Sequence, residues 1–418
     1  MRKPTHENDP EQLARIWRDA CGAAPSNERV FVSRTITPLY GGGVEAGKVD
    51  GELPIRPSGL RGQWRFWWRL LNRQGRSPAE LFAVERALWG GIGAKAASAS
   101  QVSVRVSDVS NAQLLPAFQF KKKHDGKYRG VPDPVGDVNA YALFPAQGKL
   151  APGGHAIEER PREVAKPGLG FRLRIACGDE QWPGVQQALR WWASFGGVGA
   201  RTRRGLGAVR VDGLEPVTVD EVAAAGGRLV LGKRGEDAAS AWNAAVDCLG
   251  DFRQGLGVGR RGNDRKDPGR SYWPEADAIR RLANTHSAGH APEHPVLGCY
   301  PRAAFGLPIV FQFKDKNKGD PQNSTLEPDG DFDRMASPLI LRPYWDGEGY
   351  RPAALLLPGW EQALRGSLKF KGSGHRGLAT WPVDTREQAA TAERIHPMQG
   401  HGDDPLTAFL AFFRKGVS

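Results

Sequence analysis

Residues 56–69 read Arg-Pro-Ser-Gly-Leu-Arg-Gly-Gln-Trp-Arg-Phe-Trp-Trp-Arg, and this stretch predicts an amphipathic helix over about 58–73. Pro57 cannot continue an upstream helix, and Ser58 is expected to cap the free N–H groups of the first turn. The apolar side chains that recur at helical spacing, and are expected to face a core, are Leu60, Trp64, Trp67 and Leu71.

A row of arginines follows an adjoining face of the same helix. Arg61, Arg65 and Arg69 are spaced at i, i+4 and i+8, so their guanidinium groups are expected to form one cationic stripe. A helix N-terminus also favours anions, because its first N–H groups have no partner within the helix. We interpret the start of this helix, which carries Arg56, Arg61 and Arg65, as a candidate phosphate-binding site. The candidate RNA-binding residues of this segment are Arg56, Ser58, Arg61, Arg65 and Arg69. The alternative is an amphipathic helix with solvated arginines.

The whole chain is basic. It has 418 residues and a net charge of +12, with 41 arginines, 17 lysines and 13 tryptophans. Arginine has a planar, permanently charged group that binds phosphate and stacks on bases. This composition favours a polyanionic partner, and nucleic acid in particular.

The length of the chain predicts two domains, each able to bury its own core. No run of about 18 apolar residues occurs, so no membrane span is expected. The first ten residues lack the apolar segment of a secretion signal. We expect a cytoplasmic protein whose cysteines are reduced thiols, because they are scattered and form no C-x-x-C pair: Cys21, Cys177, Cys248 and Cys299.

The first half of the chain predicts the element order β-α-β-β-α-β. Strands are expected at 30–37, 102–106, 171–175 and 206–211, and helices at 58–73 and 184–195. A polar insertion rich in glycine, proline and lysine runs from about 110 to 168. The element order is that of a ferredoxin-like domain, a four-stranded antiparallel sheet with two helices on one face.

The second half is less regular but predicts similar elements. Strands are expected at 228–231, 305–313, 337–342 and 351–357, and helices at 238–253 and 404–415. The predicted fold class is therefore α+β, with two ferredoxin-like domains and long insertions. The expected division of the chain is an N-terminal extension at 1–27, a first domain at 28–214, a linker at 215–227 and a second domain at 228–418.

A glycine-rich loop follows the second predicted helix: residues 196–207 read Gly-Gly-Val-Gly-Ala-Arg-Thr-Arg-Arg-Gly-Leu-Gly. Glycine allows the backbone to approach a ligand closely and to point successive N–H groups one way. Such a loop suits a sugar-phosphate chain, with amides for the oxygens and arginines for the charge. A dinucleotide fingerprint needs a strand before the loop and a helix after it, so that interpretation fails. The candidate RNA-binding residues of the loop are Gly197, Gly199, Arg201, Arg203, Arg204 and Gly205.

Two other basic segments are candidates for binding RNA. Lys121, Lys122 and Lys123 lie in the 110–168 insertion, which is either an RNA-contacting element or a mobile surface loop. A second glycine-rich loop, at 255–262, carries Arg260 and Arg261 and follows a predicted helix, as the loop at 196–207 does.

The sequence contains few candidates for catalytic or metal-binding residues. His124, beside Lys121–Lys123 and Tyr128, could act as a general base of a ribonuclease, but a lysine-rich turn also collects such residues by chance. No acid pair, Ser-His-Asp order or cysteine nucleophile can be defended, so we expect no catalysis and no cofactor. One segment has spacing that could bind zinc, although glycine and prolines interrupt the helix it would need: His286, His290, His294 and Cys299.

The loop at 196–207 resembles the C-terminal glycine-rich loop of the RAMP superfamily of CRISPR-associated RNA-binding proteins. Residues 37–43, Thr-Pro-Leu-Tyr-Gly-Gly-Gly, and residues 55–69 resemble one branch of it, subunit one of the type III-B (Cmr) effector complex. Residues 270–280, 304–311 and 336–343 are similar to the same branch. Together the similar segments extend from about residue 30 to residue 345.

The resemblance implies a non-catalytic subunit with two ferredoxin-like domains that caps the end of the filament holding the 3′ portion of the guide RNA. Its implied partners are guide RNA, target RNA and other RAMP subunits. The residues that match the family's motifs are Arg56, Arg61, Arg65, Gly197, Gly199, Arg204, Gly205 and Gly207. Two alternatives stay open: a metal-independent RAMP endoribonuclease that processes guide RNA, and a purely structural adaptor.

Overall fold

The computed structural model describes residues 11–12, 27–93, 96–264 and 266–417. Helices and strands alternate through both halves of the chain, so the predicted mixture of the two element types is confirmed. The predicted N-terminal extension lies almost entirely outside the described residues.

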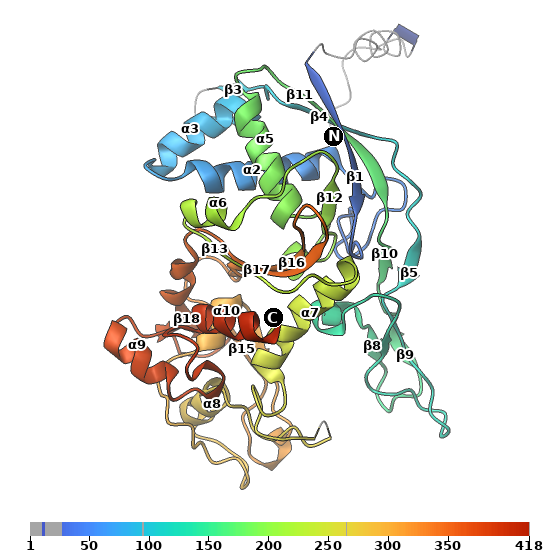
Figure 1. Ribbon diagram of the computed structural model, residues 1–418. Helices are drawn as coiled ribbons and strands as arrows, with labels where there is room; N and C mark the ends of the chain where they lie inside the picture. The colour runs from blue at the N-terminus through green and yellow to red at the C-terminus, as the bar shows by residue number, and fades with distance from the viewer. Residues whose placement is uncertain (1–10, 13–26, 94–95, 265, 418) are drawn as a thin grey trace.

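The first half is built on a four-stranded antiparallel sheet in the order β12-β1-β11-β4. Helices α2 (Pro57–Asn72) and α5 (Trp182–Phe195) cover one face of it (Figure 1). The chain order β1-α2-β4-β11-α5-β12 is the order predicted from the sequence. The strands are β1 (Glu28–Thr35), β4 (Ser103–Ser107), β11 (Gly170–Ala176) and β12 (Val209–Val211).

Helix α3 (Pro78–Trp89) is absent from the predicted elements. The residues at its start nevertheless form a capping-box pattern that is visible in the sequence. The Ser77 hydroxyl accepts a hydrogen bond from the N–H of Glu80, and the Glu80 carboxylate accepts one from the N–H of Ser77 at 2.8 Å. A short hairpin, β2 (Gly91–Ile92) with β3 (Ala97–Ser98), follows this helix.

The 110–168 insertion forms an arm of short paired strands rather than a structureless loop. In Figure 1 its β8–β9 hairpin extends away from the first sheet. A single helical turn, α4 (Ala140–Leu143), lies at its base and contacts α7 of the second half. The paired strands are β5 (Leu114–Pro116) with β10 (Glu163–Ala165), β6 (Phe118–Gln119) with β7 (Asp133–Pro134), and β8 (Lys149–Leu150) with β9 (Ile157–Glu159).

The second half contains a three-stranded sheet in the order β13-β17-β16. Its strands are β13 (Arg228–Leu231), β16 (Leu339–Trp345) and β17 (Tyr350–Leu356), and helices α7 (Ala238–Gln254) and α10 (Pro405–Gly416) cover one face.

The strand expected at 305–313 does not belong to this sheet. It appears as β14 (Ile309–Phe311) in a separate sheet, β14-β15-β18-β19. An apolar run indicates that a strand is buried but does not specify which sheet it joins. The remaining elements here are α8 (Glu275–Ala283), β15 (Ser324–Pro328), β18 (Ser367–Phe370), β19 (Leu378–Ala379) and α9 (Thr385–Ala392).

The two halves share their cores. Because side chains alternate along a strand, Ile340 and Tyr344 of β16 face the cluster around α2 and α5, whereas Leu339 and Leu341 face α7 and α10. Helices α2 and α5 therefore lie between the two sheets (Figure 1).

The predicted linker at 215–227 is part of this packed structure and not an exposed connection. It contains helix α6 (Val219–Ala224), and the side chains of Val217 and Val222 are fully buried. Its polar and alanine-rich composition resembles that of a linker, but these two valines place it in the shared core.

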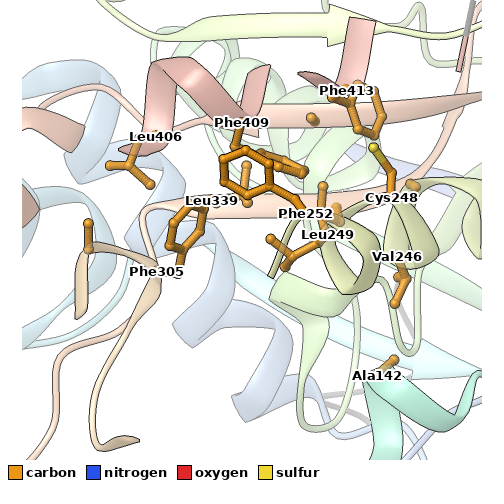
Figure 2. Packing of buried hydrophobic residues seen from close by; sticks show 14 of the residues in the cluster. Ala142, Val246, Cys248, Leu249, Phe252, Phe305, Leu339, Leu406, Phe409 and Phe413 are labelled. Atoms are coloured by element: carbon orange, nitrogen blue, oxygen red, sulfur yellow. The ribbon is translucent and has the colours of Figure 1, made fainter. Parts of the chain in front are cut away.

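Aromatic rings fill the core between β16, α7 and α10 (Figure 2). The Phe252 ring of α7 packs edge to face against the rings of Phe409 and Trp273, with ring centroids 5.5 and 5.3 Å away. Full burial of one such ring contributes roughly 1.5–3 kcal/mol. Cys248 lies in the same core, and the three described cysteines are free and buried thiols. None of the described helices has the length and apolar character needed to cross a bilayer.

A buried ion pair stabilises the region around α8. The Arg280 guanidinium donates from Nε and Nη2 to the two carboxylate oxygens of Asp320, each at 3.0 Å, and the Asp320 side chain is only 1% exposed. Burial alone would raise the pKa of Asp320, but the hydrogen bonds from Arg280 and from the Ser287 N–H outweigh it and hold the pKa at about 2.

We expect Asp320→Asn to lower the free energy of unfolding by about 2–3 kcal/mol at pH 7. The pKa of Asp320 is lower in the folded chain than its ordinary value of 3.8, so its stabilisation is present above pH 4 and is lost as the pH falls towards 2. Urea unfolding of the unaltered chain and of Asp320→Asn between pH 7 and pH 2.5 measures this effect. The difference between their free energies of unfolding should shrink as the pH falls below about 4.5. A constant difference across that range would contradict the assignment.

Candidate nucleic-acid interface

Helix α2 begins one residue earlier than predicted. Its N-cap is Arg56, in an extended conformation at φ −104° and ψ 128°, and no side chain caps the first turn. The prediction that Ser58 is the cap is therefore wrong. The reason is Pro57: its fixed φ suits the first helical position, and it forces the residue before it to be extended. The N–H groups of this turn consequently have no side-chain acceptor.

Most of the α2 arginines are paired with acids. Arg56 donates to Asp50 at 2.8 Å, and Arg65 donates to the buried Glu85 of α3 at 2.7 Å. Arg69 lies 3.6 Å from the same carboxylate. These contacts hold α3 and the 41–50 loop against α2. Within the described part of the chain, Arg61 is exposed and makes no ion pair or hydrogen bond, so it is the member of the predicted stripe whose charge stays available.

The glycine-rich loop packs mainly against the chain itself. The N–H of Val198 donates to the carbonyl of Gly207 at 2.8 Å, and the N–H of Ala200 donates to the carbonyl of Tyr40 at 2.7 Å. The N–H of Gly207 donates to the carbonyl of Pro38 at 2.8 Å. Several of the amides that were expected to face a ligand are thus used within the fold. Among the described residues, the half-buried Gly199 N–H finds no acceptor.

The glycines of this loop are required by close backbone contacts. A Cβ on Gly199, which has φ +78°, would lie 2.5 Å from the carbonyl oxygen of Tyr40. A Cβ on Gly42 would lie 3.0 Å from the Cα of Gly199. Two glycine-rich segments, 37–43 and 196–207, therefore fit together only because neither carries side chains at these points.

Arg203 and Arg204 connect the loop to the second half of the chain. Arg204 donates to the carbonyls of Leu339 and Phe305, at 3.2 and 3.3 Å, and its own carbonyl accepts a hydrogen bond from the Trp242 indole at 2.7 Å. Burial lowers the pKa of Arg204 to about 10. Arg203 donates to the carbonyl of Ser337. The interpretation of Arg204 as a residue that reaches RNA is not supported by this position, because its guanidinium is directed into the protein.

Arg342, to which sequence reasoning gave no role, makes a similar connection. Its side chain is 2% exposed and donates to the carbonyls of Gly196 at 2.7 Å, Val209 at 3.1 Å and Pro343 at 2.9 Å. Burial lowers its pKa to about 9, so it is still mainly charged at neutral pH, and among the described residues its hydrogen-bond partners are carbonyl groups and not carboxylates. An arginine inside the apolar run of β16 is the signal that could have identified it.

The 41–50 loop links α2 to the glycine-rich loop. At one end Gly42 packs on Gly199, and at the other Asp50 pairs with Arg56. The base of the arm joins the same region, because Arg201 donates from Nε to the carbonyl of Ala142 at 2.5 Å. Residues that stay at least partly accessible here include Gly42, Lys48, Arg61, Phe144, Gly199 and Arg201.

The lysine-rich segment is a hairpin turn on the arm. Lys121, Lys122 and Lys123 are exposed, and the N–H of Lys123 donates to the carbonyl of Lys127 at 2.7 Å. Lys121 pairs with Asp133 at 2.7 Å. His124 is exposed at the turn, and no described side chain orients its ring. The arm thus presents cations on an ordered hairpin but no arrangement typical of general base catalysis.

The second glycine-rich loop closes on itself. The N–H groups of Gly259 and Arg260 donate to the carbonyl of Gly255, and that of Gly262 donates to Pro268. Arg261 pairs with Glu293. This loop therefore offers less free charge and fewer free amides than the sequence indicates.

The predicted zinc ligands do not come together. Both ring nitrogens of His294 already have backbone partners, Tyr272 and Val296, and Cys299 is buried elsewhere. Within the described ranges, the potential ligands that gather are His290, Asp315 and Asp320, and Asp320 is already bound by Arg280. The i, i+4 spacing fails because 285–300 is a loop and not a helix.

The open face of the first sheet, opposite α2 and α5, also carries arginines. Each has an acidic partner: Glu28, Asp108 or Asp212. This face therefore carries much less net charge than its arginines suggest. The arginines of this face are Arg34, Arg105, Arg172, Arg174 and Arg210.

Part of this chain matches a known protein family. Residues 34–210 match the family model of the RAMP superfamily. A search of curated proteins gave no match. Among solved structures, the chain is similar to apo Cmr1 from Pyrococcus furiosus, at 15% identity over 78% of this chain and 86% of that one, with a TM-score of 0.40. It is also similar to a chain of the type III-B Cmr-beta complex bound to cognate target RNA, at 9% identity over 88% of this chain and 98% of that one, with a TM-score of 0.42.

The family match begins within β1 and ends within β12, so it covers α2, α5, the arm and the glycine-rich loop. These are the elements that build the candidate interface. The chain therefore contains a RAMP superfamily domain over residues 34–210.

Proposed function

We propose that this chain is a non-catalytic, RNA-binding subunit of a type III-B CRISPR (Cmr) interference complex. It would contact guide and target RNA, cap the end of the filament that holds the guide RNA's 3′ portion, and adjoin other RAMP subunits in the cytoplasm. The observation that carries the proposal is the RAMP match over residues 34–210. The resemblance of residues 37–43 and 55–69 to subunit one of that complex supports the more specific role.

Binding would rest on phosphate contacts. Arg61 offers an unpaired charge at the start of α2, Gly199 offers a backbone N–H, and the lysine hairpin adds further cations. Such contacts carry no sequence information, so recognition of a particular target would be left to base pairing between guide and target. The net charge of +12 favours association with a polyanion at low salt.

We also propose that the second half is a shortened ferredoxin-like domain. Its elements β13-α7-β16-β17-α10 run in the order βαββα, and its sheet order β13-β17-β16 repeats the order β1-β11-β4 of the first half. A non-catalytic role agrees with the position of His124 on an exposed turn without an orienting partner.

We expect Arg61→Ala to weaken binding of single-stranded RNA about three- to tenfold, because one charge-assisted phosphate contact is lost. The slope of log affinity against log salt should fall by about 0.7. Filter binding with a labelled RNA at several salt concentrations measures both quantities, and the recovered RNA should be uncleaved. Folding should be unaffected, since the Arg61 side chain is exposed and makes no ion pair or side-chain hydrogen bond with a described residue.

The matched control is Arg334→Ala, which removes another exposed arginine, from the 329–335 loop of the second half. It should change neither the affinity nor the salt slope. The proposal fails if Arg61→Ala behaves like this control, or if the unaltered chain shows no salt-dependent affinity for RNA.

A further inference from the structure

Phe144 is a large aromatic side chain held at an exposed position beside the glycine-rich loop. It follows α4 at the base of the arm, and its side chain is 61% exposed. Leu143, which precedes it, is buried, and Pro145, which follows it, has a φ angle restricted by its ring. The ring is therefore displayed by ordered backbone and does not belong to a flexible loop.

The support under Phe144 comes from the second half of the chain. Asn139 caps α4 by accepting a hydrogen bond from the N–H of Ala142 at 3.0 Å. The same side chain donates to Asn243 at 3.0 Å and to Asp247 at 2.8 Å, both on α7. These contacts fix the turn that carries the ring, so its exposure is a property of the fold.

A guanidinium group lies next to the ring. The Arg201 Cζ is 5.5 Å from the Phe144 ring centroid, and its Nε is held by the carbonyl of Ala142 at 2.5 Å. Arg201 is a non-glycine residue with φ +58°, the left-handed conformation in which it begins the short helical turn at Thr202–Arg204. The arm and the glycine-rich loop thus meet where an aromatic face and a cation are side by side.

The charge of Arg201 has no acidic partner among the described residues. Its hydrogen bond goes to a carbonyl, in contrast to Arg56 and Arg65, which are paired with carboxylates. Phe66, the ring beside Arg203, is half-buried and therefore less accessible to a ligand. Among the described residues beside this loop, Phe144 is the exposed ring that lies next to a cation without a counter-charge.

We propose that Phe144 and Arg201 form a nucleotide-binding position for single-stranded RNA. An unpaired base stacks on the Phe144 ring, and the adjoining phosphate lies at the Arg201 guanidinium. This inference rests on the proposed function and adds a specific contact to it. An aromatic face accepts every base, so the position fixes the path of the strand without reading its sequence.

The experiment measures fluorescence anisotropy of a labelled single-stranded RNA with the full chain. Phe144→Leu should weaken binding about tenfold, within the range of one lost base–aromatic stack. The salt slope should stay unchanged, because no charge is removed. Phe144→Trp should retain the affinity of the unaltered chain. Phe332→Leu, which changes a ring that is 79% exposed in the second half, is the control and should have no effect.

A second RNA probe of the same length, with abasic nucleotides in place of bases, separates stacking from structural damage. The unaltered chain and Phe144→Leu should bind this probe equally. Weaker binding of both probes by Phe144→Leu would overturn the inference, because it would indicate a general loss of structure. Normal binding of both probes by Phe144→Leu would also overturn it, while salt-dependent RNA binding would leave the proposed function standing. If the unaltered chain does not bind RNA at all, the proposed function fails with it.

Discussion

Replacing Arg342 with methionine is expected to lower the free energy of unfolding by about 3–5 kcal/mol. Methionine keeps much of the apolar volume but donates no hydrogen bond, so the carbonyls of Gly196, Val209 and Pro343 would be left buried without a donor. These carbonyls belong to the glycine-rich loop, to β12 and to β16, so the change should weaken the junction between the two halves. Arg342→Lys should recover only part of the loss, because one ammonium group cannot reach three divergent acceptors.

Urea unfolding followed by tryptophan fluorescence measures this effect, since many of the tryptophans lie in the affected cores. Arg334→Met is the matched control. Its guanidinium is exposed, and its loss should change the free energy of unfolding by less than about 0.5 kcal/mol. An equal and small effect of both substitutions would mean that Arg342 is not a determinant of the junction.

Gly207→Ala is expected to destabilise the chain by about 4 kcal/mol or more, a large part of the roughly 5–15 kcal/mol that stabilises an ordinary folded protein. Gly207 has φ +60°, and an added Cβ would overlap the carbonyl oxygen of Val198. That carbonyl belongs to the opposite side of the same loop, so relief of the overlap would separate segments held by the hydrogen bond from Val198 to Gly207. The strain of a left-handed alanine adds to this cost.

Gly213→Ala distinguishes steric overlap from backbone strain alone. Gly213 has a similar φ of +77°, but nothing lies near the position of its Cβ. This control should cost only about 1–2 kcal/mol, the strain of one left-handed residue. Thermal melts of the soluble proteins, together with their soluble yields, provide the comparison. If the two variants lose the same stability, the close packing of the loop is not what requires glycine at 207.

Helices α2 and α5 and the strands of the first sheet could be predicted from the sequence because their signals are local. The helical spacing of Leu60, Trp64 and Trp67 depends only on which residues follow one another, and the alternation in β11 does too. The order of these elements then leaves few ways to pair the strands. For the same reason the capping box at Ser77 could have predicted α3.

The roles of the arginines could not be predicted in this way. The residue pattern predicted that Arg61 and Arg204 bind RNA, yet Arg61 is exposed without a partner whereas Arg204 is directed at the carbonyls of Leu339 and Phe305. Those acceptors lie more than a hundred residues further along the chain. Spacing identifies a cationic stripe or loop, but not whether a distant segment already occupies the guanidinium groups.

The sequence by itself determined helices α2 and α5, the four strands of the first sheet, the basic character of the chain and its resemblance to RAMP proteins. Only the tertiary structure decided that β16 lies under the glycine-rich loop, that the segment at 215–227 is packed, and that Phe144 stands beside Arg201. The physical reason is that periodicity and charge are properties of neighbouring residues. Burial, pairing and exposure depend on which distant segments the folded chain brings into contact.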